Sequence, residues 1–114
     1  MRNSAFDFWL ERTYEVRPGE HMARNARQSR ISNCRHVEEY EGDLDAHWAK
    51  DEMRGLLERL TYGRDEGARN APTRHRILID GDPYTGTATL KSAVNLYAKF
   101  CRAWPKGRAA PARG

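Results

Sequence analysis

The segment TGTATLKSAVNLYAKFCRAW, residues 85–104, constrains the fold more than any other part of the chain. Its apolar residues recur at three- and four-residue spacing, which at about 100° per residue places them on one stripe of a helix. The opposite side carries basic and polar residues, and no acid occurs from Leu90 to Trp104. We therefore expect a closing helix capped by Thr87, with the apolar stripe Leu90, Ala93, Val94, Tyr97, Phe100, Cys101 and Trp104.

Three helical segments are expected before this one. Residues 4–14 and 22–42 each carry an apolar stripe, and residues 43–63 hold a short helical turn followed by a firmer helix, with Asp43 at a capping position. Only the apolar run ILID, residues 77–80, resembles a strand, and a single strand cannot form a sheet. The sequence thus predicts an all-α domain, a compact bundle of four or five helices with one short extended segment at 77–80.

The segments between these helices are predicted to be loops. Pro18 and Gly19 interrupt residues 16–21, and residues 64–76 are polar and contain further Gly, Asn and Pro. We expect one helical domain over residues 1–105 and a disordered basic tail over 106–114, which is rich in Ala, Pro, Gly and basic residues. The expected core consists of Phe6, Trp9, Leu10, Val37, Trp48, Leu56, Leu57, Leu60, Leu90, Val94, Tyr97 and Phe100.

The chain is expected to be a cytoplasmic protein. No run of about 18 apolar residues occurs, and the first residues lack the apolar segment of a signal peptide. The two cysteines, Cys34 and Cys101, are far apart and fall on apolar helix faces. We expect both to be buried free thiols in a reducing compartment, with a disulfide between them as the alternative.

Charge is distributed unevenly along the chain. Residues 1–63 carry ten Lys or Arg and twelve Asp or Glu, whereas residues 64–114 carry ten and four. Arg accounts for 16 of the 20 basic residues, and its planar guanidinium matches the oxygens of phosphates. A general compositional preference for Arg is the alternative explanation for this excess.

Patterns that would indicate an enzyme or a metal site are weak. The four histidines and two cysteines lack the close spacing of zinc ligands, and no phosphate-binding glycine loop or nucleophile elbow occurs. Asp80 and Asp82, with Lys91, could be compared with the carboxylates and lysine of a nuclease. Asp-Gly and Asp-Pro are nevertheless common turn dipeptides. We therefore expect no catalysis, no cofactor and no metal.

Two basic helix faces suggest contact with nucleic acid, most favourably duplex DNA. The arginines of residues 24–35 alternate with Asn and Ser residues, which also contact phosphates and base edges. If the two helices pack side by side, their basic faces could form one continuous strip and bind with strong salt dependence. The simpler alternative is two ordinary solvated helix faces. The expected contacts are Arg24, Arg27, Arg30, Arg35, Lys91, Asn95, Lys99, Arg102 and Lys106.

An acidic belt provides the alternative function. Residues 38–52 contain seven acids and one Lys. Opposite charges on two parts of one molecule can dock a basic protein or drive self-association. The chain could then be a protein-interaction adaptor, or an inhibitor of a nucleic-acid enzyme, through Glu38, Glu41, Asp43 and Asp45.

Three segments of the chain carry a resemblance to a known class of domain. They are FDFWL (6–10), RISNCRHVEEYEGDLDAHWAKDEMRGLLERLTY (30–62) and ILIDGDPYTGTATLKSAVNLYAKF (77–100). Together they resemble the small bacterial helical domain at the N-terminus of some restriction-type and mobile-element proteins, which is loosely similar to the SAM-like core-binding domain of tyrosine recombinases. The positions matching its closing helix are Thr89, Leu90, Ala93, Val94, Tyr97 and Phe100.

The resemblance implies a fold and a role in contacting DNA, but no chemistry. It covers about 95 residues, and no catalytic residue of a recombinase or nuclease can be carried over to this chain. Two biological roles are compatible with it: a DNA-binding accessory factor of a phage-like element, or a decoy that competes with the full-length enzymes. The DNA-contact role falls on Arg24, Arg27, Arg30, Lys91, Asn95, Lys99 and Arg102.

Overall fold

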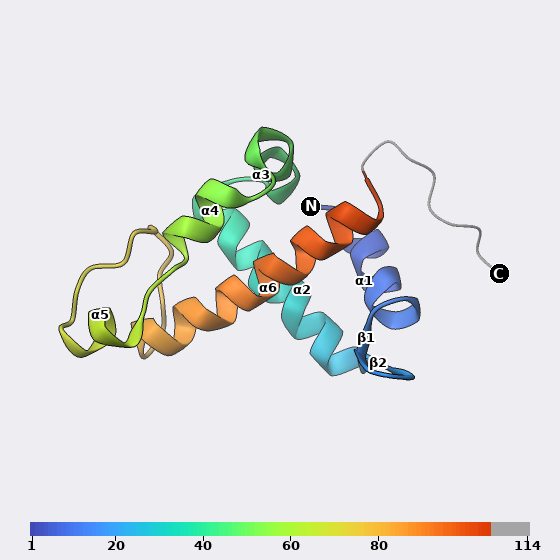
Figure 1. Ribbon diagram of the computed structural model, residues 1–114, viewed down its shortest axis with the longest axis horizontal. Helices are drawn as coiled ribbons and strands as arrows, with labels where there is room; N and C mark the ends of the chain where they lie inside the picture. Colours follow the sequence, from blue (N-terminus) through green and yellow to red (C-terminus); the bar gives the residue numbers. More distant parts are fainter. Residues whose placement is uncertain (106–114) are drawn as a thin grey trace.

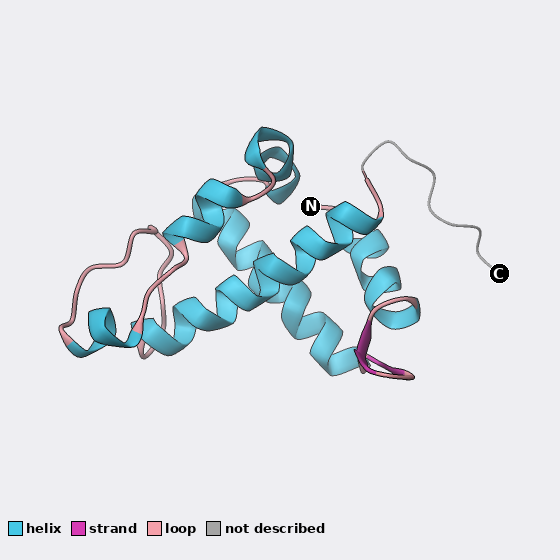
Figure 2. Cartoon of the chain, viewed as in Figure 1, coloured by secondary structure: helices cyan, strands magenta, loops and turns pink. Residues whose placement is uncertain are grey.

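The computed structural model of this protein describes residues 1–105 and is predominantly helical (Figures 1 and 2). The all-α class predicted from the sequence is confirmed. The described chain contains six helices and one small antiparallel hairpin. The elements are α1 (Asn3–Arg12), β1 (Glu15–Arg17), β2 (Glu20–His21), α2 (Arg24–Glu41), α3 (Leu44–Asp51), α4 (Arg54–Arg59), α5 (Arg64–Ala68) and α6 (Pro83–Ala103).

The two longest helices, α2 and α6, cross each other at the centre of the molecule (Figure 1). They approach closely where the Cys34 thiol donates a hydrogen bond to the Ala93 carbonyl oxygen at 3.4 Å. Helix α1 packs against one end of this crossing, where the Phe6 ring lies 5.0 Å from the ring of Tyr97 and 5.4 Å from that of Phe100. Edge-on and tilted ring contacts of this kind stabilise a core beyond simple burial.

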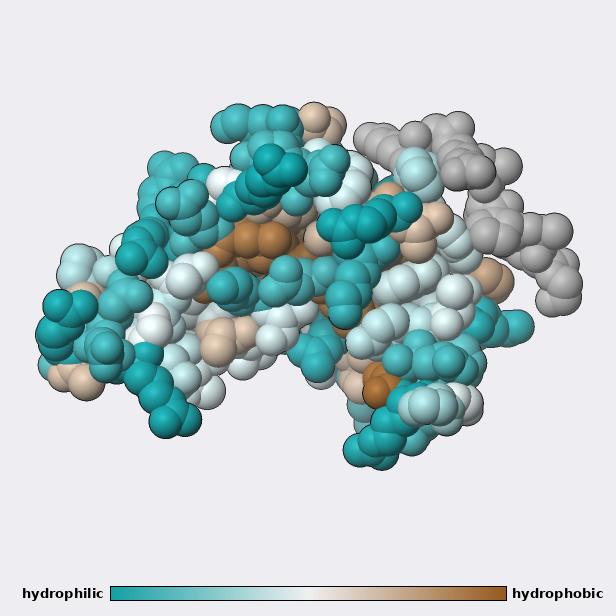
Figure 3. All heavy atoms as spheres, in the orientation of Figure 1, coloured by the Kyte–Doolittle hydropathy of each residue, from teal (hydrophilic) through white to brown (hydrophobic). Residues whose placement is uncertain are grey.

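The predicted core is largely correct. Of its twelve residues, ten are buried, whereas Trp48 and Leu57 are only partly buried and pack against the edge of the core. Both come from the α3–α4 segment, and Figure 3 shows hydrophobic surface between this segment and α6. The Arg102 guanidinium lies 5.6 Å from the centre of the Trp48 ring and covers part of it.

Helix α6 begins earlier than the sequence analysis predicted. Asp82, and not Thr87, is its N-cap: a carboxylate oxygen of Asp82 accepts hydrogen bonds from the Thr85 backbone N–H at 3.0 Å and the Thr85 hydroxyl at 2.7 Å. Pro83 occupies the first turn, where its missing N–H costs nothing. Thr87 is instead buried within the helix. Asp82 therefore caps a helix, and Asp80 lies in the loop that precedes it.

Two segments expected to be loops contain regular structure. Residues 15–21 form the β1–β2 hairpin, whose turn includes Gly19 at a φ of 77°. Residues 64–68 form the single turn of α5, which is closed by a hydrogen bond from the Gly63 N–H to the Glu66 carboxylate at 3.0 Å. Residues 77–80 pair with no strand in the described chain, and Ile77 inserts into the core while Leu78 is 71% exposed.

The described chain also bears on the expectations about membranes and thiols. No helix within residues 1–105 combines the length and the apolar character needed to span a bilayer. Cys34 and Cys101 are free and buried, as predicted. Burial raises the pKa of Cys34 to about 12 and that of Cys101 to about 11. The predicted tail, including Lys106, lies outside the described residues.

Candidate nucleic-acid interface

The outer face of α2 carries a row of uncharged polar side chains. This helix has no acid in its first turn, and Cys34 and Val37 are its only fully buried residues. Its solvent-facing side in the N-terminal half presents amides and hydroxyls, here called the polar strip. The polar strip consists of Asn25, Gln28, Ser29, Ser32 and Asn33.

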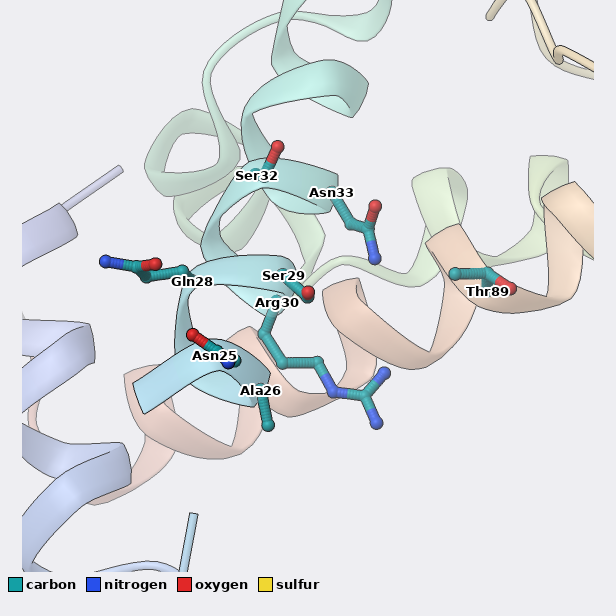
Figure 4. Close-up of a pocket in the computed structure, with 8 residues that line it drawn as sticks. All are labelled: Asn25, Ala26, Gln28, Ser29, Arg30, Ser32, Asn33 and Thr89. Carbon is teal, nitrogen blue, oxygen red and sulfur yellow. The ribbon is translucent and has the colours of Figure 1, made fainter. Parts of the chain in front are cut away.

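The polar strip lines a hollow in the angle between α2 and α6 (Figure 4). The hollow has a volume of about 780 Å³, and α6 contributes Thr89 to it. Arg30 reaches from α2 towards α6 in this view, beside Ser29. Because the two helices cross instead of running in parallel, the space between their ends stays open to solvent.

A second hollow adjoins the first and contains the same arginine. Its volume is about 280 Å³, and it lies between the hairpin, the start of α2 and the middle of α6. Neither hollow is lined by a carboxylate among the described residues. We call the two hollows together the α2–α6 surface. The lining of the second hollow is Tyr14, Val16, Met22, Arg30, Ser92, Asn95, Leu96 and Lys99.

Three of the predicted contacts therefore meet in one place: Arg30, Asn95 and Lys99. Within residues 1–105, none of these three side chains forms an ion pair or a hydrogen bond to another part of the chain. Their polar groups are thus available to a ligand. The sequence analysis did not include Ser92, although it shares a helix face with Asn95 and Lys99 at a spacing of three and seven residues.

Arg27 is used inside the fold. Its Nε donates to Asp7 at 2.9 Å, a second nitrogen lies 3.2 Å from Glu11, and a third donates to the Met22 carbonyl oxygen at 2.9 Å. The Arg27 side chain is only 11% exposed. This arginine joins α1 to α2, and its charge is already neutralised by two carboxylates.

The other predicted cations of residues 1–105 lie at other edges of the molecule. Lys91 donates to the Thr61 hydroxyl at 2.9 Å, and Arg102 covers Trp48, so both lie on the side of α6 that faces α3 and α4. At about 100° per residue, Arg24 and Arg35 fall on the edge of α2 opposite Arg30. The continuous two-helix strip expected from the sequence is thus corrected to a smaller surface around Arg30.

The acidic belt proves to be engaged in contacts within the chain. The α-amino group of Met1 donates to Glu38 at 2.9 Å and to Asp43 at 2.7 Å. This hydrogen bond lowers the pKa of Asp43 to about 2. The Tyr97 hydroxyl donates to Asp45 at 2.7 Å. These acids hold the start of the chain and α3 against α6.

The Glu41 side chain of the belt is almost completely buried. It is 3% exposed, and its carboxylate accepts hydrogen bonds from Arg59 Nε at 2.9 Å and from the Arg76 backbone N–H at 3.1 Å. It thereby ties α2 both to the end of α4 and to the loop before α6. The belt therefore presents less free negative charge than its sequence suggests.

The described chain assembles no candidate metal site either. Within residues 1–105, no three His, Cys, Asp or Glu side chains are grouped so that they could hold a metal ion. Comparisons with protein-family models, with curated proteins and with solved structures give no match to this chain. The resemblance to core-binding domains stays a prediction based on its residues.

Proposed function

We propose that this protein is a non-enzymatic domain that binds nucleic acid, specifically duplex DNA, by contacting its phosphate backbone through the α2–α6 surface. The observation that carries this proposal is the position of Arg30, which joins two hollows that no carboxylate of residues 1–105 lines. Lys99 adds a second unpaired charge from α6. Positive charge beside amides and hydroxyls is the chemistry that binds phosphates and sugars.

The number of free cations determines how binding should depend on salt. Arg30 and Lys99 lie on the surface, and Arg24 and Arg35 lie at the far edge of α2. If all four contact phosphates, the slope of log affinity against log salt should be about −3 to −4. Affinity should then fall roughly 100-fold between about 50 and 200 mM salt.

The proposal is tested by reversing the two central charges. We expect Arg30→Glu/Lys99→Glu to weaken binding to a 20-bp duplex, of about two helical turns, at least tenfold and to flatten the salt slope by about two. The matched control is Lys50→Glu/Arg54→Glu, which makes the same change in net charge on the exposed α3–α4 side. Fluorescence anisotropy at several salt concentrations measures both variants, and circular dichroism verifies that each is folded.

Two results would contradict the proposal. One is absence of measurable binding to duplex DNA even at low salt. The other is equal weakening by both double variants, because that would reflect only the overall charge. The acidic belt supports a protein partner less well, since Glu38, Glu41 and Asp45 already bind groups within the chain.

A further inference from the structure

We infer that the N-terminal half of α2 enters the major groove of DNA and that the polar strip reads base edges, with a preference for adenine. This inference rests on the proposed function and adds sequence selectivity to it. Contacts to the phosphate backbone alone give little or no sequence preference. The arrangement of side chains around α2 favours base contacts in addition.

The polar strip holds no charged residue. The exposed face of a soluble helix carries charged and polar side chains, and the five positions of the strip are all amides or hydroxyls, four of them exposed and Asn33 partly exposed. Within the described chain, none of the five forms a hydrogen bond to another residue. Their donors and acceptors are therefore free, and they point away from the core (Figure 4).

Arginines flank the polar strip on both sides. Arg30 extends from the edge that faces α6, and Arg24 and Arg35 lie along the opposite edge at about 100° per residue. A helix lying in a groove meets one phosphate strand along each edge and the base edges along its centre. Cations at both edges with neutral amides between them match that distribution of charge.

The dimensions of this face also fit the major groove. A helix with its side chains is about 10–12 Å wide, and the groove is about 12 Å wide. Asn25 and Asn33 are separated by about 12 Å along the helix axis. This length corresponds to about four base pairs at 3.4 Å each. The acids of α2 begin only at Glu38, beyond this segment.

The side chains of the strip determine which base they favour. Asn and Gln can each form a pair of hydrogen bonds with N6 and N7 of adenine, whereas Ser contacts several bases. A cytosine would call for an acid at the centre of the strip, and guanine is read best by Arg or Lys. The central positions hold neither type, so we expect a core of about four base pairs that contains adenine.

The experiment is a selection from a random 20-bp duplex library with the complete chain. We expect enrichment of an adenine-containing core that binds at least tenfold more tightly than a shuffled duplex. Replacing the core adenines by 7-deazaadenine removes the N7 acceptor and should abolish that difference, while 7-deazaguanine outside the core should not. The variant Asn25→Ala/Gln28→Ala should bind both duplexes with the affinity of the shuffled one. Both positions are exposed, and Ala favours helix, so folding should be retained.

The possible outcomes separate this inference from the proposed function. If no sequence is enriched while binding still depends on Arg30 and Lys99, the inference is overturned and the backbone proposal stands. If selectivity persists in Asn25→Ala/Gln28→Ala, the polar strip does not read bases and the inference is again overturned. If no duplex binds at all, or only RNA does, both proposals are overturned.

Discussion

The acidic belt and the α2–α6 surface differ in how the fold uses their charges. Both draw on charged segments that stand out in the sequence, and each segment could have formed a docking face. In the belt, Glu41 is 3% exposed and held by Arg59, and Glu38 accepts a hydrogen bond from the α-amino group. On the α2–α6 surface, Arg30 and Lys99 have no carboxylate beside them in the described chain.

This difference shows that a charged segment becomes a binding surface only if its charges stay unpaired. Removing an acid that is buried and paired lowers stability, because its partner is left without compensation. An exposed cation without a partner contributes little to stability. The two regions should therefore respond to mutation in opposite ways, one in unfolding and the other in binding.

The largest effect is expected at the acidic belt. Glu41→Ala removes a buried carboxylate that accepts hydrogen bonds from Arg59 and from the Arg76 backbone. We expect the free energy of unfolding to fall by about 2 kcal/mol, since one partner is still partly solvated. Urea denaturation measures this change. The control Glu39→Ala alters an exposed acid of the same helix and should have little effect. Equal stability of the two variants would show that the contacts of Glu41 do not stabilise the fold.

A smaller contrast is expected between two arginines only three positions apart. Arg27→Ala should lower the free energy of unfolding by about 1 kcal/mol, because it removes the ion pairs that connect α2 to α1. It should leave the affinity for DNA nearly unchanged. Arg30→Ala should do the reverse, with unchanged stability and about fivefold to tenfold weaker binding. Urea denaturation gives the free energy of unfolding of each variant, and fluorescence anisotropy gives its affinity for DNA. Loss of binding in Arg27→Ala at full stability would contradict our assignment.

The smallest effect concerns pH and a site outside both regions. The His75 Nδ1 accepts a hydrogen bond from the Ile77 N–H at 3.1 Å, and its Nε2 lies 2.9 Å from the Thr87 hydroxyl. Burial lowers the pKa of His75 below 6.5, and the charge of Glu41 opposes this shift. As the pH falls, His75 therefore takes up a proton in the unfolded chain before it does so in the folded protein. Stability from this group is complete above pH 6.5 and declines as the pH falls through the folded pKa.

Thermal melts at about pH 7.5 and about pH 5.5 measure this dependence. The wild type should lose stability towards acid. His75→Gln, which cannot take up the proton, should be less stable at neutral pH and should show a smaller change between the two conditions. An identical pH slope in the two proteins would show that another group is responsible.

Much of the fold was predictable because it follows from the local pattern of apolar residues. The stripes of α2 and α6 and the core around Phe6 and Tyr97 could be read directly from their spacing. The start of α6 was missed because Asp82-Pro83 is compatible with both a turn and an N-cap followed by a first-turn proline. The burial of Thr87 depends on His75, which is brought to it by a loop with no periodic signal.

The candidate site was less predictable, since it depends on which charges find partners in three dimensions. Arg27 and Arg30 look equivalent in the sequence, yet α1 places Asp7 and Glu11 beside only one of them. The separation of Lys91 and Arg102 from Lys99 likewise requires the positions of α3 and α4. The pairing of side chains across elements has no counterpart in the periodicity of a single helix.

The thiol of Cys34 is buried at the contact between α2 and α6, and its rate of alkylation should report on that contact. An alkylating reagent reaches this sulfur only when the two helices move apart, because burial hides it and keeps it protonated. The labelling rate of the native protein therefore measures how often the helix crossing opens transiently. A ligand that bridges both helices would lower this labelling rate.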